Sequence, residues 1–305
     1  MNPLVSVIIP NYNHERFLSQ RLKSVFEQTY ENFEVILLDD CSSDGSREIL
    51  QTYASHPKTS CLVFNEKNSG SPFAQWEKGI GLAKGEYIWI AESDDFSETD
   101  FLEKLIPLFL KKENIGLVYS RSNNVDENGN FFEVFWPDSL DNERWKSSHY
   151  NDGKEEVRNF LKFRNTVPNA SACIFKKQNF DFDKMKTMFF SGDWLFWATI
   201  MLSGNVYFCS EVLNHFRFHD KTTRSLKSAT HTKFQEYLYV LSFIYKNINE
   251  KLAYERNHFW IYNEMYKQSV PLAFLFKKAR PFFYAYSFFR YKLLKHQIRT
   301  KLLHR

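Results

Sequence analysis

Short apolar runs alternate with longer amphipathic stretches along the first 120 residues of the chain. The apolar runs predict strands at residues 4–10, 33–38, 61–64, 87–91 and 115–120. The amphipathic stretches carry helix start signals and predict helices at residues 15–28, 42–53, 72–83 and 98–111. This alternation predicts an α/β fold, built on a mostly parallel sheet with helices on both faces.

The pattern changes from about Val125 onward. Residues 131–150 are aromatic and irregular, and the segments after them predict helices at 153–164 and 191–203 and strands at 171–175, 206–208 and 212–218. The remaining third, from Ser225, is rich in Tyr and Phe and is predicted to be mostly helical.

Three carboxylates follow the apolar run 87–91 within four positions, as Glu92, Ser93, Asp94 and Asp95. Open α/β sheets bind their ligands just beyond the carboxyl ends of the strands. Mutual repulsion raises the pKa of clustered carboxylates unless a cation neutralises it, and a hard divalent cation that bridges to substrate phosphates would do so. The alternative is a solvated acidic turn that caps the following helix.

The turn after the first strand excludes one function class. A dinucleotide oxidoreductase needs a glycine-rich turn there, whereas this chain has IIPNYNHERF. The same segment lacks the glycine-rich, basic loop with which a nucleotidyltransferase holds a triphosphate.

Four cysteines, Cys41, Cys61, Cys173 and Cys209, have neither paired nor metal-ligand spacing. We interpret them as reduced core thiols of a cytoplasmic protein. Met1 is followed directly by a predicted strand, and no apolar run reaches the roughly 18 residues of a membrane span.

The segment 271–305 interleaves Phe, Tyr and Leu with Lys and Arg, and no acidic residue occurs from Tyr266 to the end. Such a composition is typical of helices that lie on anionic membranes, which would place the protein at the inner face of the plasma membrane as a peripheral protein. The dense Phe and Leu content fits lipid better than nucleic acid. The alternative is a C-terminal helix that packs on its own domain.

The motifs of residues 4–220 together resemble those of family 2 glycosyltransferases, which have the GT-A fold. They read SVIIPNYNHERF, EVILLDDCSSDGS, NSGSPFAQWEKG, GEYIWIAESDD and, further on, SGDW and NHFRFH. The resemblance implies a GT-A domain at residues 1–222, with a nucleotide-sugar half at 1–122 and an acceptor half at 123–222. Residues 223–305 are then a helical C-terminal extension.

The resemblance also implies a donor site at the strand ends. Asp40 would accept hydrogen bonds from the base or ribose, and Asp94 and Asp95 would hold Mg²⁺ or Mn²⁺ beside the diphosphate. Glu92 replaces the usual first Asp of this motif. The residues expected near the nucleotide are Pro10, Tyr12, Asp39, Asp40, Asn68, Gly70, Glu92 and Ser93.

Downstream, the pair Gly192-Asp193 matches the position of the family's catalytic base. Inverting transfer needs a base that deprotonates the acceptor hydroxyl, and Asp193 would be that base; the alternative is a simple helix cap. Trp194 and Trp197 are expected as a sugar-facing wall, with at least one of the two packing in the core instead. Arg217 and His219, two residues apart on one strand face, are expected near the diphosphate, and Asn169 near the acceptor.

These features predict an inverting glycosyltransferase that moves a sugar from a nucleotide donor, a UDP-sugar by preference, to a glycan or lipid-linked glycan acceptor in cell-surface polysaccharide synthesis. Two alternatives stay open. One is a catalytically inactive module that binds nucleotide-sugars. The other is a nucleotidyltransferase, which the turn after the first strand disfavours.

Overall fold

The computed structural model describes residues 2–132, 135–219 and 230–251, together with residues 258, 260, 261, 264, 265, 277 and 291. The segment 271–305, for which membrane contact is predicted, lies outside the described residues except for Lys277 and Tyr291. Among the described helices, none combines the length and the apolar character needed to cross a membrane.

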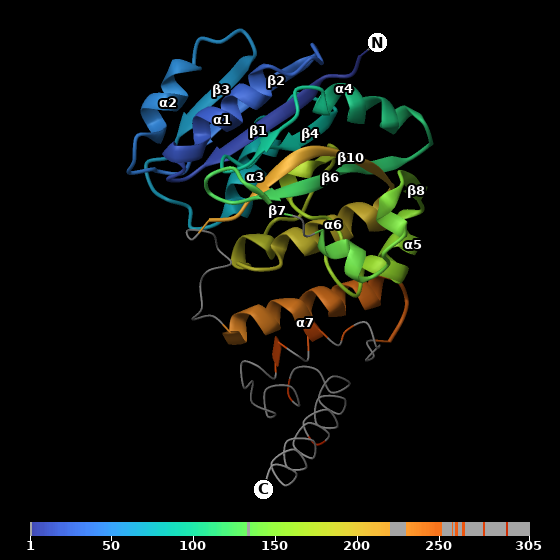
Figure 1. The fold of residues 1–305 in the computed structure, drawn as a ribbon. Coiled ribbons are helices and arrows are strands. Elements are labelled where there is room, and N and C mark those ends of the chain that lie inside the picture. Colours follow the sequence, from blue (N-terminus) through green and yellow to red (C-terminus); the bar gives the residue numbers. More distant parts are fainter. Residues whose placement is uncertain are drawn as a thin grey trace, which may run out of the picture.

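The described chain forms one large sheet with helices on both of its faces (Figure 1). The strands are β1 (Val5–Asn11), β2 (Phe33–Asp39), β3 (Thr59–Phe64), β4 (Tyr87–Ile90), β5 (Phe96–Ser97), β6 (Ile115–Val125), β7 (Phe131–Phe132), β8 (His149–Asn151), β9 (Cys173–Lys176) and β10 (Asn205–Arg217). The α-helices are α1 (Glu15–Phe26), α2 (Ser46–Thr52), α3 (Pro72–Leu82), α4 (Phe101–Leu105), α5 (Gly153–Glu156), α6 (Gly192–Ser203) and α7 (Thr230–Asn247).

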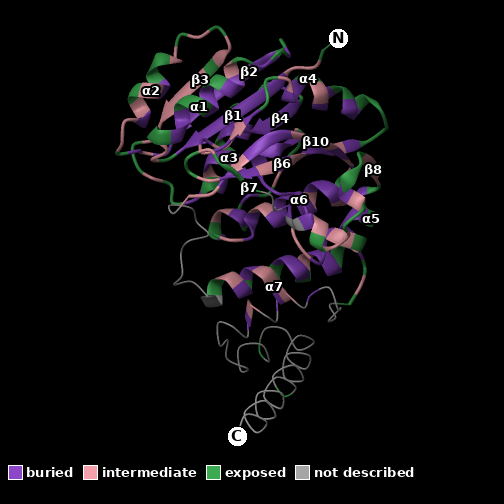
Figure 2. Cartoon of the chain, viewed as in Figure 1, coloured by how far each residue is buried: buried purple, intermediate pink, exposed green. Residues whose placement is uncertain are grey.

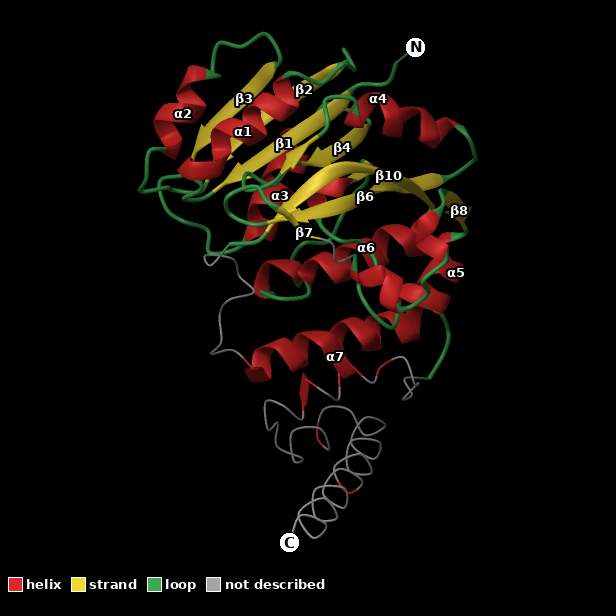
Figure 3. Cartoon of the chain, in the orientation of Figure 1, coloured by secondary structure: helices red, strands yellow, loops and turns green. Residues whose placement is uncertain are grey.

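The strand order is β3-β2-β1-β4-β9-β6-β10-β5, and β3, β2, β1 and β4 can be followed side by side in Figure 3. The long pairings β1–β2, β1–β4, β2–β3 and β6–β10 are parallel. The short strand β9 is antiparallel to both of its neighbours, β4 and β6, and so joins the two parallel blocks. The predicted α/β fold class with a sheet between flanking helices is confirmed.

Several helices and strands begin or end at other residues than the sequence predicts. The runs predicted as strands at 206–208 and 212–218 form one strand, β10, whose pairing with β6 is irregular between Cys209 and Val212. Strand β6 continues to Val125 because β10 pairs with it along that length. The helix predicted at 98–111 is α4 followed by a 3-10 helix, Ile106–Leu110, with a proline in its first turn.

Two hydrophobic clusters cover the two faces of the sheet, and the buried positions form a continuous layer through the strands (Figure 2). Successive side chains of a strand point to opposite faces, so Ile8 joins one cluster while Val7 and Ile9 join the other. The cluster of Ile8 also contains Trp197 of α6 and Leu241 of α7. Helix α7 therefore shares a core with the domain that carries the predicted site.

The four cysteines are free thiols. Cys173 and Cys209 are buried, whereas Cys41 and Cys61 are partly exposed.

Candidate active site

The acidic motif lies directly after β4 and is enclosed by other elements. The indole Nε1 of Trp76, on α3, donates a hydrogen bond to Glu92 Oε1 over 2.8 Å. Burial and then the charge of Asp94 raise the pKa of Glu92 to about 8. The same two causes raise the pKa of Asp95 to about 7. The motif therefore contains more negative charge than its surroundings readily stabilise.

Two arginines compensate part of this charge. Arg21, fully buried on α1, donates from Nε to the carbonyl oxygen of Glu92 over 2.8 Å. Burial lowers the pKa of Arg21 to about 10, and the charges of Asp95, Asp94 and Glu92 oppose that change. Arg217 on β10 donates from Nε to the carbonyl oxygen of Asp94 and from its backbone N–H to Asp95 Oδ1, over 2.8 and 2.9 Å. These contacts hold the motif in one conformation.

Asp94 and two histidines form a group that fits a metal ion. Nε2 of His219 lies 3.1 Å from Asp94 Oδ2, and one ligand atom each from His14, Asp94 and His219 lie within 4.8 Å of one another. His14 Nδ1 lies 2.8 Å from the hydroxyl of Ser93, which ties His14 to the acidic motif. Burial acts to raise the pKa of Asp94, but the hydrogen bond from His219 and the charge of His14 bring it below its ordinary value. An ionised carboxylate with two imidazoles is a suitable ligand set for a divalent transition metal.

Asp94 and Asp95, predicted as a pair of metal ligands, have different surroundings. Asp94 belongs to the group with His14 and His219, whereas the buried carboxylate of Asp95 accepts the backbone N–H of Arg217. From the sequence, His219 is expected beside the diphosphate, and no pattern indicates a role for His14.

Two of the predicted nucleotide residues, Asp39 and Asp40, lie at the carboxyl end of β2. Asp39 accepts hydrogen bonds from Asn11 Nδ2 and from Arg47 Nε, each over 3.0 Å. Asp40 accepts from Asn65, Ser69 and Gln75. Both carboxylates are buried and bonded to the protein, so they order the loops that follow the strands.

Asn68 and Gly70 form a tight turn beside Asp40. Asn68 Nδ2 donates to the carbonyl oxygen of Asp40 over 2.9 Å, and its Oδ1 accepts the N–H of Gly70 over 2.7 Å. Gly70 has a φ of +73°, a conformation that favours glycine. At the end of β1, Pro10 is buried, while Tyr12 is 47% exposed.

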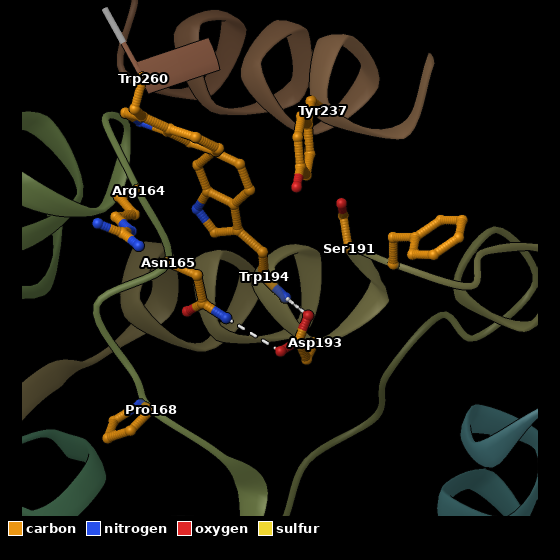
Figure 4. A pocket seen from close by; sticks show the side chains of 9 residues that line it. Arg164, Asn165, Pro168, Ser191, Asp193, Trp194, Tyr237 and Trp260 are labelled. Atoms are coloured by element: carbon orange, nitrogen blue, oxygen red, sulfur yellow. Dashed lines mark hydrogen bonds between the residues drawn. The ribbon is translucent and has the colours of Figure 1, made fainter. Parts of the chain in front are cut away.

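Asp193 lies at the first turn of α6 and lines a pocket of about 170 Å³ (Figure 4). Its carboxylate accepts hydrogen bonds from Asn165 Nδ2 over 3.0 Å and from the backbone N–H of Trp194 over 2.8 Å. The other lining residues are Arg164, Pro168, Phe190, Ser191, Trp194, Tyr237 and Trp260. Asp193 is thus accessible from a pocket with aromatic walls, as a base for a sugar hydroxyl would need to be.

The remaining predicted acceptor residues take different positions. Trp194 is buried and donates from Nε1 to the carbonyl oxygen of Leu161 over 2.8 Å, with part of its ring at the pocket. Trp197 is fully buried in the core. Asn169 caps the short turn before β9 by accepting the N–H of Ala172 over 2.9 Å. The polar amide in the pocket is that of Asn165, which sequence reasoning did not identify.

Helix α7 holds the segment that leads into α6. The buried carboxylate of Glu236 accepts three backbone N–H groups, those of Phe189, Phe190 and Ser191, over 2.8, 2.7 and 3.0 Å. In Figure 4 the hydroxyl of the neighbouring Tyr237 points toward Ser191 and Asp193. Burial and the charge of Asp193 raise the pKa of Tyr237. No local pattern in the sequence indicates that Glu236 or Tyr237 belongs to the site.

Helix α3 contacts both the acidic motif and the start of α6. Trp76 bonds Glu92, and its ring lies 5.0 Å from that of Phe73 between centroids. A Cβ on Gly192 would lie 2.4 Å from Cε2 of Phe73, so any larger residue directly before Asp193 would force this ring to shift. The two groups of predicted site residues are therefore connected through one helix.

Solved glycosyltransferases share this fold. The structure of residues 1–349 of S. aureus TarS in complex with UDP-GlcNAc superposes with a TM-score of 0.64, over 86% of this chain and 72% of that one, at 18% identity. The mannosyltransferase PcManGT from Pyrobaculum calidifontis, in complex with GDP-Man and Mn²⁺, gives a TM-score of 0.55 over 83% and 66% at 17% identity. The GT-A fold is thereby confirmed.

Sequence similarity gives the family. Chondroitin synthase of Escherichia coli is 36% identical over 138 residues, which is 44% of this chain and 20% of that enzyme. The chain spans less than half of the length of several such relatives. The sequence model of glycosyl transferase family 2 matches residues 6–183, which is more than half of the chain. The protein therefore belongs to glycosyl transferase family 2.

Proposed function

We propose that the protein is an inverting glycosyltransferase that transfers a sugar from a nucleotide-diphosphate donor to a glycan or lipid-linked glycan in cell-surface polysaccharide synthesis. The observation that carries this proposal is Asp193, a carboxylate that lines a pocket and is linked through α3 to the acidic motif. A UDP-sugar is the preferred donor, because TarS, which has the same fold, binds UDP-GlcNAc.

In the proposed reaction, an acceptor hydroxyl in the pocket gives its proton to Asp193 while its oxygen attacks the anomeric carbon of the donor. The bond from that carbon to the diphosphate oxygen breaks, and the nucleoside diphosphate leaves with the electron pair. Attack from the opposite side inverts the anomeric centre. Asn165 and the backbone N–H of Trp194 hold the carboxylate in place through their hydrogen bonds.

Asp94, His14 and His219 are the residues that would hold a divalent cation, which when bound stabilises the negative charge of the leaving diphosphate. Imidazole nitrogen binds transition metals in preference to Mg²⁺. We therefore propose Mn²⁺ rather than Mg²⁺. The complex of PcManGT with Mn²⁺ supports this choice.

The proposed Mn²⁺ site at His14, Asp94 and His219 can be tested by thermal unfolding. In the presence of UDP, Mn²⁺ should raise the thermal midpoint of the protein more than Mg²⁺ does, because a ligand of the folded state stabilises it. His219→Gln should weaken Mn²⁺ binding by about tenfold or more, since it removes a ligand. His56→Gln, at a histidine outside the group, is the matched control. If Mn²⁺ and Mg²⁺ raised the thermal midpoint equally, or if His219→Gln left the affinity for Mn²⁺ unchanged, these residues would not be the metal site.

We also propose that residues 271–305 bring the enzyme to the inner face of the plasma membrane, where a lipid-linked acceptor would be found. The basic and aromatic composition of the segment supports this. We expect the full chain to bind vesicles that contain phosphatidylglycerol but not vesicles of phosphatidylcholine alone. A chain ending at residue 270 should lose this binding, and retained binding would refute the assignment.

The proposed function is tested by incubating the protein with Mn²⁺ and a panel of UDP- and GDP-sugars and measuring release of the nucleoside diphosphate. We expect release from one class of donor, with further stimulation by an acceptor and inverted stereochemistry in the product. Donor binding without any release, with acceptors present, would instead favour a module that only binds nucleotide-sugars.

A further inference from the structure

We propose that the pocket beside Asp193 binds an acceptor sugar that carries an anionic group, a carboxylate or a phosphate, and that Arg164 recognises this group. The inference rests on the proposed function, because it takes this pocket as the acceptor site. The pocket, at about 170 Å³, is smaller than the 300–1,000 Å³ or so typical of sites for drug-sized ligands, so it suits a single sugar residue.

Arg164 lines the pocket and is only partly engaged by the protein. Its Nη1 donates to the hydroxyl of Ser139 over 3.1 Å, and its Cζ lies 5.6 Å from the ring of Trp260. Within the part of the chain that the structure describes, no carboxylate forms an ion pair with Arg164. The remaining N–H groups of its planar guanidinium are therefore available for a carboxylate or phosphate, which such a group binds in bidentate fashion.

Three other arginines contrast with Arg164. Arg121, Arg144 and Arg158 each pair with a carboxylate, those of Asp138, Glu156 and Glu155. Burial lowers the pKa of Arg164, and Tyr237 opposes that change, yet arginine stays charged in proteins. A partly desolvated cation without a carboxylate partner gains from an anionic ligand.

The arrangement of the walls indicates where the anionic group lies relative to the reacting hydroxyl. In Figure 4 Asn165 lies between Arg164 and Asp193, while Trp260 and Tyr237 line another side of the pocket. The rings of Trp260 and Tyr237 lie 5.4 Å apart between centroids and offer an apolar surface to a sugar ring. A hydroxyl at Asp193 and an anionic substituent at Arg164 therefore belong to the same sugar residue or to adjacent groups of one acceptor. The positive charge of Arg164 offsets repulsion between that substituent and Asp193.

Three small probes test the inference: methyl β-D-glucuronide, glucose 6-phosphate and the neutral methyl β-D-glucoside. Their dissociation constants are measured by calorimetric titration of the full chain with UDP and Mn²⁺ present. We expect at least one anionic probe to bind about tenfold more tightly than the glucoside, as a charged hydrogen-bonded pair at a partly exposed site implies. Preference for the glucuronide indicates a uronate acceptor, and preference for the phosphate indicates a phosphorylated one.

Arg164→Gln should remove this preference, and Arg164→Lys should keep part of it. Lys23→Gln, at a well-exposed lysine on α1, removes the same charge elsewhere and should leave the preference intact. Equal binding of all three probes by the wild type, binding of none, or a preference that survives in Arg164→Gln would overturn the inference. Binding of UDP with Mn²⁺ is measured separately, so that its absence marks a failure of the proposed function rather than of the role of Arg164.

Discussion

Asp193→Asn should lower the turnover number for sugar transfer by about a thousandfold, within the range found for removal of a general base. The asparagine keeps the size of the side chain and an oxygen that can accept the hydrogen bond from Asn165 or from the backbone N–H of Trp194. It cannot accept the proton of the acceptor hydroxyl. Asp193 lies in the pocket and does not belong to the candidate metal group of His14, Asp94 and His219. The variant should therefore bind UDP with Mn²⁺ as the wild type does.

The matched control for this variant is Asp183→Asn, at a highly exposed aspartate, which should retain full activity. The measurement is the steady-state rate of nucleotide release with acceptor, alongside calorimetric titration of UDP. If Asp193→Asn transferred sugar at the wild-type rate, Asp193 would be a helix cap and the base would be another group.

Glu236→Gln should lower the free energy of unfolding by about 2–3 kcal/mol, since a buried carboxylate that accepts three N–H groups is replaced by an amide with one oxygen. The new NH₂ group would face backbone donors of residues 189–191. The segment directly precedes Gly192 and Asp193, so turnover should also fall at temperatures where the variant is fully folded. Denaturant unfolding and acceptor-dependent nucleotide release measure the two effects.

Two further variants make this prediction specific. Glu236→Asp keeps a carboxylate and should recover part of the activity. Glu77→Gln removes an exposed ion pair with Lys186, and such pairs contribute at most about 1 kcal/mol. Wild-type stability together with wild-type turnover in Glu236→Gln would show that α7 does not position the start of α6.

The elements that could be predicted from the sequence are those whose signal is local. The strands β1, β2 and β4 lie inside the sheet and are buried on both faces, so their sequences are continuous apolar runs. The strands β5 and β7 have two residues each, and they exist only because β10 and β6 offer a pairing edge. Such pairing depends on tertiary contacts that no short segment encodes.

The same distinction applies to the candidate site. The acidic motif and Gly192-Asp193 stand out in the sequence, because they combine a strand or helix end with clustered charge. His14 lies beside Ser93 only after β1 and β4 have paired, and Glu236 meets residues 189–191 only after α7 has packed. Asn165 bonds Asp193 and Asn169 caps the turn before β9, and no pattern in this stretch of sequence indicates which amide faces the pocket.

The donor site is tested most directly by the thermal midpoint of the full chain with UDP, GDP and their sugar conjugates, each with and without Mn²⁺. We expect stabilisation by one nucleotide class, dependent on Mn²⁺ and lost in Asp94→Asn, because Asp94 belongs to the group of residues that would hold the cation. An absence of stabilisation by every nucleotide, or stabilisation that Asp94→Asn leaves unchanged, would contradict a donor site at this edge of the sheet.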